Sequence, residues 1–328
     1  MRQQAPFLHC GDRVYHHYAD ILIALVPTLI LPTLYYGFRP LLLMLSGMVT
    51  AVFCELIGCL CMHRKPTVGD CSAAATGALI GALMSPLCPY WMPVIGAAFA
   101  ILIVKLPFGG TGRYLFSPAA AALALLSQCW PHRLFTYPVL STPLPLTGEI
   151  TLSSYVTETS PAGQLFTGAY TVNDHMSLLL GMVPGPIAAT GVLVLLAAAA
   201  FLCIRRSAFL WVTCPYILTC AAFALLFPRM DGALLNSVIT ELCSGYLLFT
   251  GVFLLHSCIT PCSRPGRIAY GVLAGLLVML LRHFGQFEEG ACFAVLIANA
   301  FAPMLDRLGW RLQSGFTHWR ERKEVKRA

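Results

Sequence analysis

Hydrophobic residues in this chain form long, nearly uncharged runs that are separated by short polar segments. Ten runs are predicted to be helices, over residues 19–38, 41–62, 71–87, 90–107, 115–131, 184–204, 207–227, 238–257, 268–284 and 289–306. A transmembrane helix needs about 20 mostly apolar residues to cross roughly 30 Å of hydrocarbon, and these runs approach that length. The pattern therefore predicts an all-α integral membrane protein with about ten transmembrane helices.

Composition supports this prediction. Hydrophobic residues make up 58% of the 328 positions and charged residues only 11%, whereas a soluble domain is typically about 25% charged. A soluble globular domain is therefore excluded. The first run continues through Phe38 without a small-residue cleavage site, so we expect a first span rather than a cleavable signal peptide.

The basic residues predict an orientation. With ten spans both termini lie on one side, and placing that side in the cytoplasm puts seventeen Lys and Arg residues inside and four outside. Lys and Arg prefer the cytoplasmic side of a membrane. We therefore expect a multi-pass protein of the cell (inner or plasma) membrane with both termini cytoplasmic. Its basic tail is expected to attract anionic lipid, and no nucleic-acid-binding motif accompanies it.

A long polar segment divides the chain. We expect a first five-helix half over residues 1–131, an extracytoplasmic loop over 132–183, a second five-helix half over 184–306 and a basic cytoplasmic tail over 307–328. Because each half has an odd number of spans, the halves run in opposite senses, which is compatible with an inverted repeat. The halves share no convincing sequence similarity.

Three charged residues in or beside the spans are candidates for an ion path, because charge inside a bilayer is costly. They are Glu55, Asp70 and Lys105. Each has a structural alternative: an interhelical hydrogen bond for Glu55, the N-cap of the next helix for Asp70, and extension of the amine to the inner surface for Lys105. The pair Glu288–Glu289 is expected to be a solvated helix start.

Cysteines and glycines give weaker signals. The fourteen Cys lie mostly in apolar runs and form no CxxC pair, so they are expected to be packing residues, with a metal or iron–sulfur role shared with a partner as the alternative. Gly77 and Gly81 favour close helix packing. The glycine-rich turn over 108–113 suits close backbone approach or simply separates two helices. No metal site and no catalytic residue are predicted.

Short motifs along the whole chain resemble those of one family. In the first half they are Lys65-Pro-Thr-Val-Gly-Asp70-Cys-Ser72-Ala, Thr76-Gly77, Phe108-Gly-Gly-Thr-Gly112 and Phe116-Ser-Pro-Ala119. In the second half they are Gly181-Met-Val-Pro-Gly185, Gly266-Arg267, Glu289-Gly290 and Phe301-Ala-Pro-Met-Leu-Asp306. In this order they resemble the D subunit of the Rnf ion-translocating electron transport complex and the related B subunit of the sodium-pumping NADH:quinone oxidoreductase.

The resemblance implies a core membrane subunit of a complex that couples redox chemistry between ferredoxin and NAD to Na+ or H+ movement. The other subunits of an Rnf-type complex and membrane lipid would be its partners, and the chain would not be an enzyme alone. The resemblance also implies FMN, which the family esterifies through its phosphate to a Thr in an Asp-x-x-Ser-x-Ala-Thr motif of the outside loop.

This chain departs from the family at that motif. Ser160 and Ala162 match it, whereas Thr157 replaces the Asp and Gly163 stands at the attachment position. Glycine has no hydroxyl, so a phosphodiester cannot form there. FMN is therefore expected from the family while its covalent attachment is doubtful, with Thr157, Thr159 and Thr167 as substitute attachment candidates.

Other family residues are also replaced. Tyr114 stands at the Asn that usually precedes Phe-Asn-Pro-Ala, and Ser117 replaces the Asn inside that motif. Ala189 takes the place of the acid in the family's Gly-Glu-Thr. The chain is thus expected to be a divergent Rnf-type subunit. The alternative is a small-solute channel or transporter of the inner membrane, which would transport without partner subunits or flavin.

Overall fold

The computed structural model describes residues 14–63, 68–146, 155–168, 175–205, 210–229, 234–256, 259–285 and 289–325. Its first half contains α1 Val14–Leu25, η1 Pro27–Leu29, α2 Ile30–Tyr36, α3 Arg39–Cys61, η2 Val68–Asp70, α4 Ser72–Ala82, α5 Trp91–Phe99, the π-helix η3 Ala100–Lys105, α6 Pro118–Cys129 and α7 Pro131–Leu134. The connecting segment contains β1 Tyr137–Pro138, β2 Thr157–Glu158, α8 Pro161–Thr167 and α9 His175–Leu180.

The second half is also helical. It contains α10 Val192–Arg205, α11 Leu210–Leu226, α12 Leu234–Cys243, α13 Leu247–Phe249, the π-helix η5 Thr250–Leu254, α14 Arg264–Phe284 and α15 Ala291–Val325. The antiparallel pair β1–β2 is the only sheet within the described ranges. The predicted all-α class is confirmed.

The helices follow the predicted spans in order. Four are long and apolar enough to cross a membrane: Tyr15–Tyr36, Arg39–Cys61, Arg264–Phe284 and Ala291–Gln313. A fifth candidate is the helix pair Asn236–Cys243 and Leu247–Leu254, which is bent by 61° and has the form of a broken span or a re-entrant loop. The shorter apolar helices are Ser72–Ala82, Trp91–Lys105, Pro118–Cys129, Val192–Arg205 and Leu210–Leu226. Each of these segments corresponds to one predicted run.

Two spans are shorter than predicted. The third ends as a helix at Ala82 instead of 87, and the sixth begins at Val192 instead of 184. The stretches that were predicted to be helical but are not, residues 83–87 and 184–191, contain prolines. Proline lacks an N–H donor and disfavours a helix before it. Irregular backbone at membrane depth must find partners inside the protein. Here the two stretches supply each other, because the Ile187 N–H donates to the Met84 carbonyl (3.0 Å) and the Ala188 N–H to the Ala82 carbonyl (2.8 Å).

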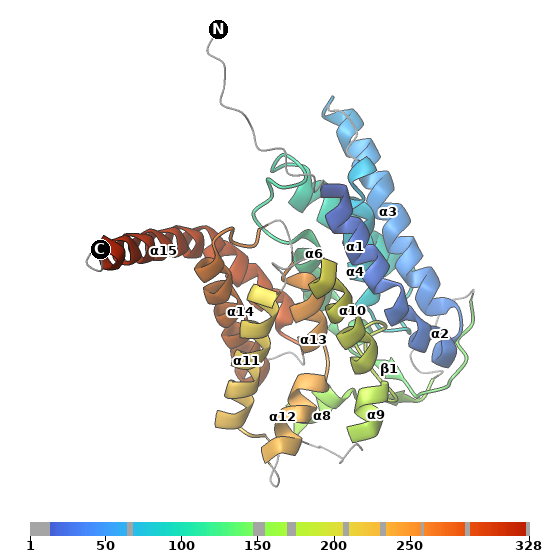
Figure 1. Cartoon of the computed structure of the whole chain (residues 1–328). Helices are drawn as coiled ribbons and strands as arrows, with labels where there is room; N and C mark the ends of the chain where they lie inside the picture. Colours follow the sequence, from blue (N-terminus) through green and yellow to red (C-terminus); the bar gives the residue numbers. More distant parts are fainter. Residues whose placement is uncertain are drawn as a thin grey trace.

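Small residues bring α3 and α4 together. The backbones meet at Gly47 and Gly77, where a Cβ atom on Gly77 would overlap the Gly47 carbonyl and lie 2.6 Å from its carbon. A Cβ atom on Gly81 would lie 2.6 Å from the Met44 Cα. The predicted role of these glycines in close packing is confirmed. Figure 1 shows α1, α3 and α4 side by side, with α11, α14 and α15 on the other side of α6, α10 and α13.

The loops gather at two ends of the bundle. At one end, Tyr18 contacts Tyr114, and Asp20 pairs with Arg205 (2.9 Å). At the opposite end, toward the bottom of Figure 1, lie β1, α8, α9 and α12. The end of the bundle with Tyr18 and Asp20 contains the segments that the basic-residue count places on the same side as the termini. We call this end the terminal side and the opposite end the loop side.

Candidate functional site

A buried ion pair joins the second and fourth spans on the terminal side. Glu55 of α3 and Lys105 at the end of η3 are 0% and 1% exposed, and Lys105 Nζ lies 2.6 Å from Glu55 Oε1. Lys105 Nζ also donates to Ser72 Oγ at the start of α4 (2.7 Å). The expected extension of Lys105 to the surface is therefore wrong, whereas an interhelical hydrogen bond of Glu55 is confirmed. Two buried charges are tolerated because each one satisfies the other.

The glycine-rich turn completes this cluster. Gly109, Gly110 and Gly112 have φ values of +110°, +89° and +84°, which L-residues rarely adopt. The turn brings Thr111 Oγ1 to 3.1 Å from Ser72 Oγ. We name Glu55, Ser72, Lys105 and Thr111 the Glu55 cluster. Two features that are separate in the sequence, the intramembrane charges and the glycine-rich turn, thus belong to one site.

Asp70 lies next to this cluster in the sequence but makes none of its contacts within the described chain. It is half-buried in η2. The N-cap of α4 is Cys71, in the left-handed conformation (φ 54°) and without a side-chain capping bond. The expected N-cap role of Asp70 is therefore wrong by one residue. The left-handed turn at Cys71 instead directs the chain so that Ser72 faces Lys105.

Two interrupted spans meet in the middle of the bundle. The helix of the third span ends early, at Ala82, and the eighth is bent by 61° between α12 and α13, at Ser244–Tyr246. Tyr246, 1% exposed, donates its hydroxyl to the Leu83 carbonyl just past the end of α4 (2.7 Å). Each of these positions falls in the third span of its predicted half. Irregular backbone between helix segments at membrane depth is a common feature of a transporter's binding site.

A second charged network holds the break of the eighth span on the loop side. Glu241 of α12 lies 3.5 Å from Arg229 Nε and 3.4 Å from Arg282 Nε of α14. Arg282 also donates to Ser244 Oγ (2.5 Å) and to the Ser244 carbonyl (3.2 Å). The sequence places Arg229 and Arg282 among ordinary outside basic residues. Nothing in the local pattern indicates that Arg282 is only 2% exposed.

Glu289, two residues before the start of α15, supports the same break. Its Oε1 accepts a hydrogen bond from the Tyr246 N–H (3.0 Å), and the residue is 3% exposed. An acidic group at a helix start accepts free N–H donors and is favoured by the helix dipole. The expected solvated helix start is therefore wrong for Glu289, and Glu288 lies outside the described residues. The carboxylate fits because Gly245 has no side chain: a Cβ atom there would overlap Glu289 Oε1.

The FMN-like motif lies directly on this break. Ser160 is the N-cap of α8, and its Oγ accepts from the Gly163 N–H (3.0 Å). Ser160, Ala162 and Gly163 are all buried, and a Cβ atom on Gly245 would lie 3.1 Å from the Ala162 Cβ. A small pocket separates these elements, lined by Ser160, Pro161, Val183, Pro184, Gly185, Pro186, Ala189, Thr190, Cys243, Ser244 and Gly245. Ala189, another expected departure from the family, therefore lines the same pocket as Ser160.

The residues present do not fit a phosphodiester at the family's attachment position. Gly163 offers no hydroxyl, and it is packed inside α8. The hydroxyl-bearing candidates Thr157, Thr159 and Thr167 are exposed. Thr167 lies one turn after Gly163, and its hydroxyl donates to the Gly163 carbonyl (3.0 Å). None of these three threonines lines the pocket that the motif forms.

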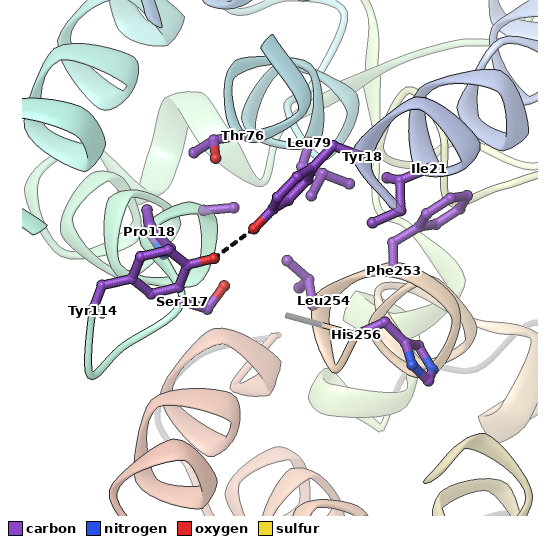
Figure 2. A pocket seen from close by; sticks show the side chains of 11 residues that line it. Tyr18, Ile21, Thr76, Leu79, Tyr114, Ser117, Pro118, Phe253, Leu254 and His256 are labelled. Atoms are coloured by element: carbon purple, nitrogen blue, oxygen red, sulfur yellow. Dashed lines mark hydrogen bonds between the residues drawn. The ribbon is translucent and has the colours of Figure 1, made fainter. Parts of the chain in front are cut away.

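A second pocket lies on the terminal side (Figure 2). It is lined by Tyr18, Ile21, Thr76, Leu79, Tyr114, Ser117, Pro118, Ala119, Phe253, Leu254 and His256. Figure 2 shows Tyr18 and Tyr114 pointing toward each other, with their hydroxyl oxygens 2.7 Å apart. Tyr114 and Ser117 are both departures from the family motif. Two residues that we expect to replace family residues therefore line one pocket. One of them, Tyr114, is hydrogen-bonded to Tyr18 of α1.

The described part of the chain holds no group of three His, Cys, Asp or Glu side chains that could bind a metal ion. Cys54, Cys59, Cys220 and Cys292 lie in the apolar core.

Arg39, also missed by the sequence analysis, is fully buried at the loop side. It donates to the carbonyls of Pro86 (3.2 Å) and Cys88 (3.2 Å) in the irregular stretch after α4.

Comparison with known proteins agrees with the motifs. The model of the NQR2, RnfD, RnfE family matches residues 1–312. The D subunit of the ion-translocating oxidoreductase complex of Aeromonas salmonicida is 32% identical, over 93% of this chain and 95% of the relative. The D subunit of the Na(+)-translocating ferredoxin:NAD(+) oxidoreductase complex of Acetobacterium woodii is 29% identical, over 88% and 86%. Its proton-translocating counterpart in Clostridium ljungdahlii is 26% identical, over 92% of each chain. The full-length match and the shared motifs lead to one conclusion: this chain belongs to the NQR2, RnfD, RnfE family.

Proposed function

We propose that this chain is the D-type membrane subunit of an Rnf-type complex that couples ferredoxin–NAD electron transfer to movement of Na+ or H+. Relatives covering most of the chain are subunits of such complexes, named for Na+ in one case and for protons in another. The chain works with the other subunits and is not catalytic alone. Its terminal side faces the cytoplasm in an inner or plasma membrane, as the excess of basic residues on that side favours.

The observation that carries this proposal is the contact between the irregular parts of the third and eighth spans, in which Tyr246 donates to the Leu83 carbonyl. Broken helices leave backbone carbonyls at membrane depth, where they can replace part of the hydration shell of an ion. The contact lies between the Glu55 cluster on the terminal side and the Glu241–Arg282–Glu289 network on the loop side. Buried polar groups therefore lie on both sides of this contact, and we propose that the ion route passes it.

Glu55 is the residue proposed to receive the ion. Its carboxylate lies 2.6 Å from the Lys105 amine, so an arriving cation competes with Lys105 for the same oxygen. Lys105 keeps Ser72 as a second partner when Glu55 is engaged. Asp70 adds a half-buried negative charge close to the start of α4, and we propose that it attracts the ion toward the Glu55 cluster.

The test measures ions moved per electron in proteoliposomes that contain the purified complex. Glu55→Gln should lower coupled ion uptake several-fold while the complex still assembles. Asp20→Asn is the matched control, because Asp20 is also a buried carboxylate paired with a base on the terminal side. Unchanged coupling in Glu55→Gln would remove Glu55 from the mechanism.

A double variant separates transport from stability. Glu55→Gln with Lys105→Met removes both buried charges, so no charge is left unpaired. If the pair only holds α3 to η3, the double variant should regain coupling. If Glu55 lies on the ion route, coupling should stay low although the complex is stable. Solute transport by the purified chain without its partners would instead favour the alternative, a channel or transporter.

We also propose that this subunit carries no covalently attached FMN. The support is chemical and geometric: Gly163 has no hydroxyl, it is buried, and its N–H is already bound by Ser160 Oγ. The denatured subunit, taken from the intact complex, should show no flavin fluorescence on a gel. An FMN-sized adduct on Thr157, Thr159 or Thr167 in peptide mass spectrometry would overturn this proposal and identify the substitute attachment site.

A further inference from the structure

The last helix continues far beyond the bundle. On the terminal side, Asp306 Oδ1 accepts hydrogen bonds from the Cys262 N–H (3.1 Å) and the Ser263 N–H (2.9 Å), so α15 at this point is level with the start of α14. Helix α15 nevertheless runs on to Val325. At 1.5 Å per residue, residues 307–325 add about 28 Å. Figure 1 shows this extension leaving the bundle sideways, across the direction of α11 and α14.

Tryptophans indicate that the extension starts at the depth of the lipid headgroups. Trp211, at the start of α11, is 41% exposed, and the Arg264 guanidinium lies 5.7 Å from its ring centre. Trp310, one turn after Asp306, is 54% exposed. Tryptophan concentrates at membrane–water interfaces because one part of the ring is apolar and its N–H is polar. A helix that leaves the bundle sideways at this depth runs along the membrane surface.

The extension has an apolar and a basic face. Leu305, Leu308 and Leu312 recur at intervals of three and four residues, and Leu308 and Leu312 are 42% and 66% exposed. In the sequence the same spacing continues to Phe316 and Trp319. Arg307 and Arg311 fall at other angles around the helix. Apolar residues at this spacing, bordered by basic ones, are typical of helices that lie in the interface plane.

Charge selects the kind of surface. Residues 307–328 contain seven Lys or Arg and two Glu, so the segment carries a net charge of five positive units. We propose that residues 307–325 form an interfacial helix that lies on the membrane surface on the terminal side and binds anionic lipid headgroups. Leu308 and Leu312 enter the acyl boundary, and Arg307 and Arg311 meet the phosphates. This assignment does not depend on the proposed electron transport.

The test is hydrogen–deuterium exchange of the intact complex in nanodiscs, either of phosphatidylcholine alone or with added phosphatidylglycerol. Amides of 310–325 should exchange about tenfold more slowly in the anionic discs, since anionic headgroups attract basic residues near the surface. High salt should remove the difference. Amides of residues 291–304, in the packed part of α15, serve as the internal reference and should not change.

Two double variants separate the contribution of the basic residues from that of the apolar residues. Arg307→Gln with Arg311→Gln should lose the lipid-dependent protection, and Leu308→Ser with Leu312→Ser should lose it too while the 291–304 reference stays protected. Equal protection in both disc types that disappears when partner subunits are removed would overturn the proposal in favour of a protein partner. Rapid exchange of 310–325 in both discs would overturn it in favour of a helix standing free in water.

Discussion

Gly245 is the position where the structure makes its sharpest energetic prediction. It has a left-handed backbone (φ +62°), and a Cβ atom there would overlap the Glu289 carboxylate and lie 3.1 Å from the Ala162 Cβ. Gly245→Ala should therefore displace Glu289 from the Tyr246 N–H, which it now accepts at 3.0 Å. The break of the eighth span would lose its support from Glu289.

The cost has two parts. An alanine in the left-handed region costs roughly 1–2 kcal/mol. Loss of a buried hydrogen bond to a charged group costs about 1.5–3 kcal/mol. Gly168→Ala is a matched control, because Gly168 has nearly the same φ (+69°) but no atom within 4 Å of its added Cβ. The control should incur only the first cost, so the difference between the variants measures the displacement of Glu289.

Heating followed by fluorescence-detected size exclusion of the purified complex gives the comparison. Gly245→Ala should melt at least about 3 °C below Gly168→Ala, from the 1.5–3 kcal/mol above and roughly 2–4 °C per kcal/mol. Equal melting temperatures would refute the reasoning. Glu289→Ala in the Gly245→Ala background should cost little more, because the bond is already lost; additive losses would mean that Gly245 and Glu289 act independently.

Three further predictions follow from buried contacts, each measured by the same thermal assay. Lys105→Met alone should destabilise by about 3–5 kcal/mol because it strands the Glu55 carboxylate; the same loss in a Glu55→Gln background would contradict the pairing. Arg39→Met should cost at least about 2 kcal/mol, because the carbonyls after α4 lose a charged donor; wild-type melting would show that they find other partners. Gly77→Ala should cost more than about 2 kcal/mol by forcing α3 from α4, whereas Gly69→Ala, with no atom within 4 Å of its added Cβ, should be nearly neutral.

Hydropathy predicts the ten runs and their order because the bilayer sets one length for every crossing. The length requirement acts on each segment separately, so it can be recognised in one sequence without knowledge of the other segments. Glycine spacing likewise predicts the close approach of α3 and α4, because only the local absence of side chains permits it. Family membership is readable for a similar reason, since short motifs recur in order whatever their surroundings.

Other features depend on partners far away in the chain. The third and sixth spans stop short because the stretch near Met84 pairs with the stretch near Ile187, about one hundred residues later. Lys105 is buried rather than surface-seeking because Glu55 and Ser72 come from two other helices. The sequence therefore determines which segments enter the membrane. The tertiary structure alone decides which buried charges meet, because a charge is stable in a low-dielectric interior only where the fold supplies its counterpart.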